Sequence, residues 1–149
     1  MRFAMPYHPY DFELPCEWWA EAGMESFIPQ TESYASAAAE RVIIVPLADV
    51  QPLRRAVERD WRGFSKERMV GILQRIASKR EISPIDVIEM PCEHHPKPQF
   101  RYAFYDGFHR FHASIAAGFK SIPAIVRPDL DAFFLAETKM RLAPSPDVT

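Results

Sequence analysis

The length and charge of the chain limit what it can be. It has 149 residues, and a chain of this size buries roughly 70% of its unfolded surface, enough for one domain without disulfides or metal. Eighteen basic and twenty acidic residues give a net charge of -2, which argues against bulk electrostatic binding to nucleic acid. Two cysteines are too few for a disulfide framework, and no apolar run is long enough for a signal peptide or a membrane span. We therefore expect a soluble cytoplasmic protein with no membrane segment and no tight intrinsic DNA binding.

Residues 1–40 differ in composition from the rest and are expected to form an aromatic, proline-rich arm. Within it, Pro15 suits a first helical position, and a short helix over Cys16–Ala22 is expected to end at Gly23. The small and polar stretch 31–39 is interpreted as a linker or a loose helix. The arm either folds over the core, where it could also close a ligand pocket, or meets a partner protein or a second copy of the chain.

The middle of the chain predicts a strand, a helix and a second strand. Arg41–Pro46 is a β-branched apolar run typical of a buried strand, and 47–64 shows no clean strand pattern. Ser65 suits the N-cap of an amphipathic helix over residues 65–78, and Ile85–Met90 has strand composition. The apolar helix positions follow i, i+3, i+4, i+7 spacing: Met69, Ile72, Leu73 and Ile76.

The last third predicts two more strands and two helices. Phe100–Tyr105 is expected to be a strand that forms a hairpin with 85–90, and Phe108–Ala117 a helix capped by Gly118. Ile122–Val126 is a further strand, in which Pro123 indicates a sheet edge or a strand start. A helix over Asp129–Arg141 and a frayed tail over 142–149 complete the chain. The order predicts an α+β domain over 41–141, with a small mixed β-sheet and packed helices.

The block Tyr105–Arg110 stands at a predicted strand-to-helix turn. Gly107 lets a ligand approach the backbone, and the helix start offers N–H groups and partial positive charge. His109 and Arg110 add two side-chain donors. The residues therefore indicate an anion pocket, most naturally for nucleotide phosphate. The alternative is a tight turn with an Asp cap and exposed basic side chains, and composition alone favours it.

The sequence resembles the ParB/sulfiredoxin superfamily over about residues 41–140. The likeness lies in a G-x-H-R turn at a helix start, a small-residue helix, a glycine and an I-P strand, here Gly107, His109, Arg110, Ala113, Ala117, Gly118, Ile122 and Pro123. Val45-Pro46-Leu47 and Ser83-Pro84-Ile85-Asp86-Val87 resemble earlier strands of the family.

That resemblance implies a nucleotide ligand, ATP or CTP, with or without Mg²⁺. Gly107, Phe108, His109 and Arg110 would hold the phosphates, and the family's helix contacts fall on Arg68, Gly71 and Arg75. Arg68 and Arg75 are seven residues apart and share one helix face. A solvated basic face is nearly as good an interpretation of that pair.

Three branches of the superfamily differ in what they require. Sulfiredoxins need a catalytic cysteine where this chain has Phe108, so repair of an over-oxidised cysteine is strongly disfavoured. ParB proteins add a helix-turn-helix domain, for which the sequence up to Thr149 leaves no room, so a CTP-gated DNA clamp is not expected. Small free-standing relatives have been labelled nuclease-like. Nucleotide-dependent kinases in the superfamily need an acidic base, for which Asp86, Glu89, Glu93 and Asp106 are candidates and Asp106 is nearest the turn.

Two functions remain open on these grounds. The first is a nucleotide-dependent enzyme, an NTPase or phosphotransferase with Asp106 as its catalytic residue. The second is a non-catalytic nucleotide- or DNA-associated module that acts through a partner protein. A carboxylate close to the phosphates favours the first.

Thiol and imidazole groups gather in the sequence without the spacing of a metal site. They are Cys92, His94 and His95 in a loop, and His109 and His112 one helical turn apart. No C-x-x-C or H-E-x-x-H spacing is present, so we expect no metal site. A polar surface loop, with His112 on a helix flank, is the plainer interpretation.

Overall fold

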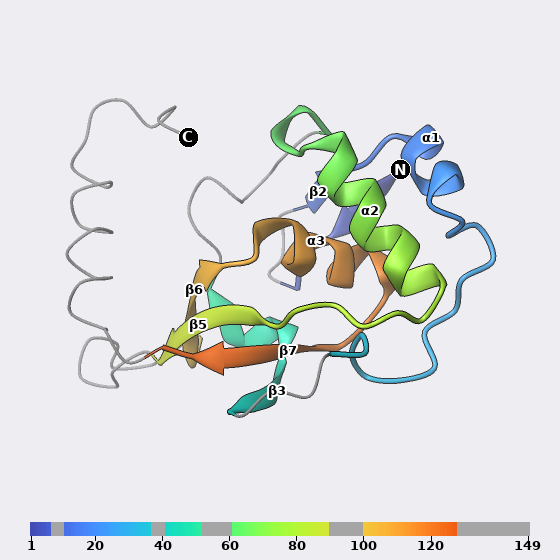
Figure 1. Ribbon diagram of the computed structural model, residues 1–149. Helices are drawn as coiled ribbons and strands as arrows, with labels where there is room; N and C mark the ends of the chain where they lie inside the picture. Colours follow the sequence, from blue (N-terminus) through green and yellow to red (C-terminus); the bar gives the residue numbers. More distant parts are fainter. Residues whose placement is uncertain (7–10, 37–40, 52–60, 90–99, 128–149) are drawn as a thin grey trace, which may run out of the picture.

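The main sheet has five strands of mixed direction and lies below the helices in Figure 1. A computed structural model of the chain describes residues 1–6, 11–36, 41–51, 61–89 and 100–127. The strand order is β3-β7-β5-β6-β4. The strands are β3 (Val42–Pro46), β4 (Val50–Gln51), β5 (Ile85–Glu89), β6 (Tyr102–Asp106) and β7 (Ser121–Val126). The four predicted strands thus share one sheet, and the predicted α+β class is confirmed.

The sheet combines parallel and antiparallel pairs. β5 and β6 pair antiparallel, as the predicted hairpin requires, while β5 pairs parallel with β7. One detail of the predicted strand order was wrong. The segment 47–64 does contain a strand, β4, which pairs parallel with β6 between two short 3₁₀ turns, η1 (Leu47–Asp49) and η3 (Trp61–Gly63). β7 is an inner strand, so of the two places predicted for Pro123, a sheet edge and a strand start, the sheet edge is excluded.

Proline is tolerated in this inner strand because of its place in the register. Pro123 pairs with Ile44 of β3, and the pairing of β7 with β5 begins one residue later, at Ala124. The residue that lacks an N–H therefore precedes the parallel pairing with β5, near the start of the strand.

Helices α2 (Lys66–Ala77) and α3 (Phe108–Ala117) cover one face of the sheet (Figure 1). Ser65 caps α2 as predicted, and its hydroxyl oxygen accepts the N–H of Arg68 at 3.4 Å. The apolar stripe of α2 is buried at Met69, Leu73 and Ile76. α3 ends at Gly118 in the left-handed region, with φ of 91°. Both helices match their predicted spans within one residue.

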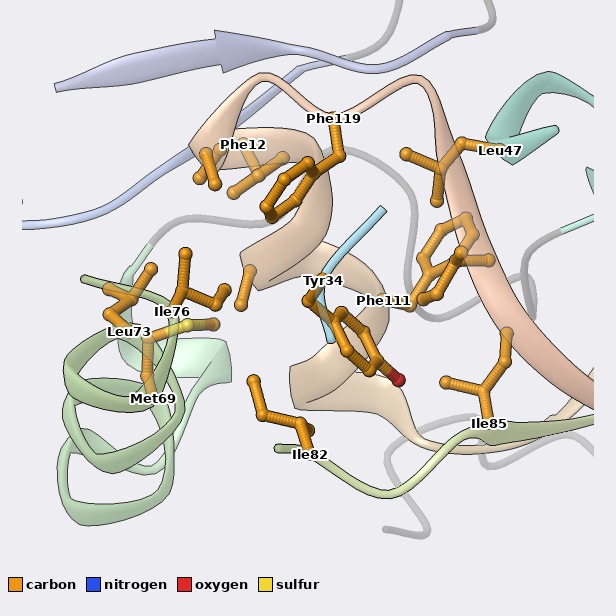
Figure 2. Close-up of a cluster of buried hydrophobic side chains, with 14 of the residues drawn as sticks. Phe12, Tyr34, Leu47, Met69, Leu73, Ile76, Ile82, Ile85, Phe111 and Phe119 are labelled. Carbon is orange, nitrogen blue, oxygen red and sulfur yellow. The ribbon is translucent and has the colours of Figure 1, made fainter. Parts of the chain in front are cut away.

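The amino-terminal segment is part of the same hydrophobic core. β1 (Arg2–Ala4) and β2 (Asp11–Glu13) form a separate two-stranded antiparallel sheet, followed by α1 (Cys16–Glu21). The short helix predicted there is confirmed. Phe12 and Leu14 are completely buried, and Figure 2 shows Phe12 within the cluster of buried side chains. The arm therefore folds against the helices over its described residues. The domain boundary at residue 40 stays a prediction.

Other expectations fall outside the described residues, namely the helix over 129–141, the tail over 142–149 and the loop over 91–99. Among the residues that the structure describes, no helix has the length and apolar character needed to cross a membrane.

Candidate functional site

A cleft of about 580 Å³ opens between α2 and the start of α3. Its walls carry three arginines from the two helices, two carboxylates and the glycine of the turn. The lining residues are Gly63, Glu67, Arg68, Gly71, Ile72, Arg75, Asp106, Gly107, Phe108, His109 and Arg110. Every residue that the sequence singled out as a nucleotide contact, and Asp106, therefore lies around one cleft. None of the described residues of the arm lines it.

The α2 wall is a basic helix face with a gap at its centre. Arg68 and Arg75 are exposed and lie on either side of Gly71. A Cβ added at Gly71 meets no atom within 4 Å, so the helix presents bare backbone to open space there. The glycine leaves room for a ligand between two cations on the same helix face.

The opposite wall begins at Gly107, a position where the fold requires glycine. Its φ is +112°, and an added Cβ would lie 2.5 Å from Cγ2 of Ile85. Gly107 is also the N-cap of the ten-residue helix α3, and no side chain caps it. The Asp cap of the alternative interpretation is thus not formed by Asp106. The positive end of α3 faces the cleft.

Arg110 is held in place by main-chain carbonyls. Its Nη1 donates to the carbonyl oxygen of Pro84 at 2.7 Å and more distantly to that of Ser83 at 3.4 Å. Its Nη2 lies 3.8 Å from Oδ2 of Asp106, a carboxylate that is 69% exposed. Such an exposed pair contributes about 0–1 kcal/mol, so Asp106 competes only weakly with an incoming anion. The anchored guanidinium keeps its remaining donors for a ligand.

His109 connects the two walls as a neutral ring. The backbone N–H of Ser65 donates to its Nε2 at 2.9 Å, which ties the start of α3 to the start of α2. Burial lowers the pKa of His109 from 6.5 to about 4, and the nearby charge of Arg68 adds to this effect. With Nε2 occupied as an acceptor, only Nδ1–H is left to donate. His109 therefore offers a ligand one neutral donor at pH 7.

Phe108 and His112 belong to an aromatic cluster behind the cleft. The two rings are 4.6 Å apart, and Phe108 also lies 5.3 Å from Phe64. His112 is completely buried, and its Nδ1 donates to the carbonyl oxygen of Phe108 at 2.9 Å. His112 lies on a flank of α3 as expected, but that flank is buried because the arm covers it: the ring of Phe12 lies 5.0 Å from the ring of His112.

Two of the acidic side chains line the cleft, Asp106 and Glu67. Glu67 was not among the acidic residues that the sequence offered as candidates. The feature of the sequence that could have indicated Glu67 is its position next to Arg68 in the first turn of a helix capped by Ser65. Asp86 is paired with Arg127 at 2.9 Å, and Glu89 does not line the cleft. Glu93 lies outside the described residues.

No group of three metal-ligating side chains occurs among the described residues. Cys92, His94 and His95 fall outside them, so the described part of the chain leaves that cluster untested.

Fold and site together define an α+β domain with a basic cleft at a glycine turn that opens a helix. The model of the ParB N-terminal domain family matches residues 31–138, most of the chain, and the chain belongs to that family. No curated protein matches it.

The comparison with solved structures finds similar chains at low sequence identity. Sulfiredoxin from Arabidopsis thaliana is 20% identical with a TM-score of 0.50, over 65% of this chain and 96% of that one. The C-terminally truncated chromosome-partitioning protein ParB from Caulobacter crescentus, complexed with CTP-gamma-S, is 22% identical with a TM-score of 0.45, over 68% of this chain. The match covers 52% of that ParB chain, so this protein corresponds to about half of it.

Proposed function

We propose that this domain binds a nucleoside phosphate in the cleft between α2 and α3. The observation that carries the proposal is the convergence of Arg68, Arg75 and Arg110 on one cleft at the start of α3. Guanidinium groups and a helix N-terminus both favour phosphate oxygens, and Arg binds them in a bidentate manner. Three such groups on one cavity suit a ligand with several phosphate charges.

The size and lining of the cleft support a nucleotide over a simple anion. Its volume of about 580 Å³ falls within the roughly 300–1,000 Å³ of small-molecule pockets. Ile72 and Phe108 add apolar surface beside the cations, which suits a base or a ribose. The superfamily resemblance makes ATP and CTP the first ligands to test.

Magnesium fits the same cleft as a companion of the phosphates. Mg²⁺ in nucleotide sites is held by one or two carboxylates together with the phosphates. Glu67 and Asp106 are the carboxylates in the lining that would supply those ligands. When bound, the ion would neutralise phosphate charge.

A thermal-shift and calorimetric panel tests binding directly. Nucleoside mono-, di- and triphosphates are added with and without Mg²⁺, and a ligand at a hundred times its Kd stabilises by about 2.7 kcal/mol. Arg68→Ala and Arg75→Ala are each expected to weaken binding about tenfold, which is about 1.4 kcal/mol. Arg80→Ala is the matched control, because Arg80 is an exposed arginine beyond the end of α2 and outside the cleft. Absence of binding to every nucleotide would overturn the proposal.

Whether the bound nucleotide reacts is a second question, and Asp106 is the residue that we propose as acid or base. Its exposed carboxylate lies at the edge of the turn beside Arg110. Asp106→Asn is expected to retain nucleotide binding and to lose phosphate release. Glu67→Gln is the comparison, since Glu67 is the other acid in the cleft.

A non-catalytic module that acts through a partner protein is the other candidate. This function needs only the three arginines of the cleft and no acid or base. Tight nucleotide binding without turnover by the wild type would decide for this candidate. A gel shift with duplex DNA is expected to show only non-specific binding, with a Kd of ~10⁻⁴ M or weaker at physiological salt.

A further inference from the structure

Tyr34 lies outside the turn motif and reaches the segment that anchors Arg110. Its side chain is 4% exposed, and its hydroxyl donates to the carbonyl oxygen of Ser83 at 2.6 Å. Figure 2 shows the Tyr34 ring inside the buried cluster, with its hydroxyl oxygen directed toward the chain between Ile82 and Ile85. Burial raises the pKa of this hydroxyl, so it stays protonated and remains a donor at ordinary pH.

The chain on either side of this contact is fixed by the backbone. The N–H of Ile82 donates to the carbonyl oxygen of Ala35 at 2.8 Å, and Ser36 forms a parallel bridge with Ile82. The backbone carbonyl oxygen of Glu32 accepts the N–H groups of Lys120, just before β7, and of Ser121, its first residue. Residues 32–36 thus connect the segment before β5 to the segment after α3.

Arg110 shares one of its two carbonyl acceptors with Tyr34. Its Nη1 donates to the oxygens of Ser83 and Pro84, so Tyr34 and Arg110 share the Ser83 acceptor. A carbonyl oxygen has two lone pairs and accepts both donors. The hydroxyl of Tyr34 therefore holds the Ser83 carbonyl, which is the more distant of the two carbonyls that accept from Arg110 and precedes the nearer one, Pro84, by one residue. Arg110 is one of the residues that line the cleft.

We propose that Tyr34 is a positioning residue for Arg110, through which the amino-terminal segment sets the geometry of the anion site. This inference rests on the proposed function, since the ligand of Arg110 is the nucleoside phosphate. Tyr34 does not line the cleft, and its hydroxyl is connected to Arg110 through the carbonyl of Ser83.

The test removes one hydroxyl. Tyr34→Phe keeps the ring in the core and is expected to weaken triphosphate binding about fivefold, the net worth of one hydrogen bond. Tyr102→Phe is the matched control, because Tyr102 is also buried but lies in β6 away from Arg110. Circular dichroism and thermal melting check that both variants fold.

A double-mutant cycle separates positioning from a general structural effect. In an Arg110→Lys background, Tyr34→Phe is expected to cause no further loss of affinity, because the group it positions is gone. An equal loss in both backgrounds would overturn the inference while leaving the proposed function intact. So would an unchanged affinity in the Tyr34→Phe single variant.

A readout without nucleotide keeps the two proposals separable. The guanidinium ¹⁵N–¹H signals of Arg110, assigned by their loss in Arg110→Lys, are expected to shift in Tyr34→Phe and to stay in place in Tyr102→Phe. Unchanged signals in Tyr34→Phe would sink the inference even where nucleotide binds. If no nucleotide binds the wild type, the proposed function fails, and a shift in these signals still supports the positioning of Arg110 by Tyr34.

Discussion

Gly107 combines two requirements at the scale of a single residue. It has a positive φ of +112°, and its missing side chain lets Ile85 approach. Gly107→Ala is therefore expected to lower the free energy of unfolding by about 1–3 kcal/mol, from backbone strain and overpacking together. Urea denaturation followed by circular dichroism measures the loss. The control is Gly23→Ala, which shares the positive φ of 78° but meets nothing within 4 Å. Equal losses at the two glycines would mean that contact with Ile85 contributes nothing.

The low pKa of His109 gives the protein a defined pH dependence. The pKa falls from 6.5 to about 4 on folding, so between these values the unfolded chain binds a proton more readily than the folded protein. The contribution of the neutral ring is complete above pH 6.5 and is lost progressively as the pH falls toward 4. Urea midpoints are measured from about pH 7.5 to about pH 4, a range that spans the shift in pKa. They are expected to fall more steeply in the wild type than in His109→Gln.

The glutamine variant isolates one group. Its amide oxygen is expected to accept the Ser65 N–H but does not titrate, and the remaining titratable groups are common to both proteins. Parallel pH profiles in the two proteins would contradict the assignment.

The residues of the turn were predictable, but their detailed states were not. Gly107, His109 and Arg110 form a local motif in the sequence, and the structure brings them to one cleft with Arg68 and Arg75. The acceptor role of His109 depends on Ser65, 44 residues away, and the anchoring of Arg110 depends on the segment before β5. Such contacts follow from the packing of elements, which no local pattern encodes.

At the scale of an element, α2 carries a glycine, Gly71, that neither the backbone conformation nor the packing of the helix requires. Gly71 has no positive φ, and a Cβ there meets open space. Gly71→Ala is expected to raise the free energy of unfolding by about 0.5–1 kcal/mol, because glycine is a poor helix former. Gly71→Leu is expected to fold as well as the alanine variant and to weaken nucleotide binding at least about tenfold, by filling the space between Arg68 and Arg75.

The two readouts move in opposite directions, which distinguishes a ligand-facing glycine from an indifferent one. Thermal melting gives stability, and calorimetry with the nucleotide found in the binding panel gives affinity. An unchanged affinity in Gly71→Leu would show that the ligand does not lie against α2.

Elements with a long periodic signal were predicted well. The apolar stripe of α2 from Met69 to Ile76 matches the structure. The β-branched run Arg41–Pro46 forms the strand β3 as predicted, but its predicted burial was wrong, because β3 lies at the edge of the sheet and only Val45 in it is buried. β4 was missed because a strand of two residues has no period to detect. Pro123 left two places open, a sheet edge and a strand start, and only the register of β7 in the sheet decides between them.

At the scale of the whole molecule, the segment before the family match supplies part of the core. The match begins at residue 31, yet Phe12, Leu14 and Met24 are buried within the common hydrophobic cluster. Phe12 packs edge-on against Phe64 at 5.8 Å and against His112 at 5.0 Å, behind the cleft. Composition set residues 1–40 apart as an arm, but composition does not show where an arm packs.

Phe12→Ala is therefore expected to lower the free energy of unfolding by about 3–5 kcal/mol, the cost of a cavity at a fully buried aromatic ring. That is a large part of the roughly 5–15 kcal/mol that stabilises a typical domain. Phe3→Ala, at a half-buried ring that contacts Phe12 from the outer side of the core, is expected to cost less. Urea unfolding of both variants, at a pH above the titration of His109, gives the comparison.

A chain that begins at Thr31 extends the test, because it lacks all of these side chains while keeping the family match and every lining residue of the cleft. Because the amino-terminal side chains belong to the same core, the shortened chain is expected to lose its cooperative unfolding transition in urea. Cooperative unfolding at the same urea midpoint as the full chain would show that these side chains are not part of one common core.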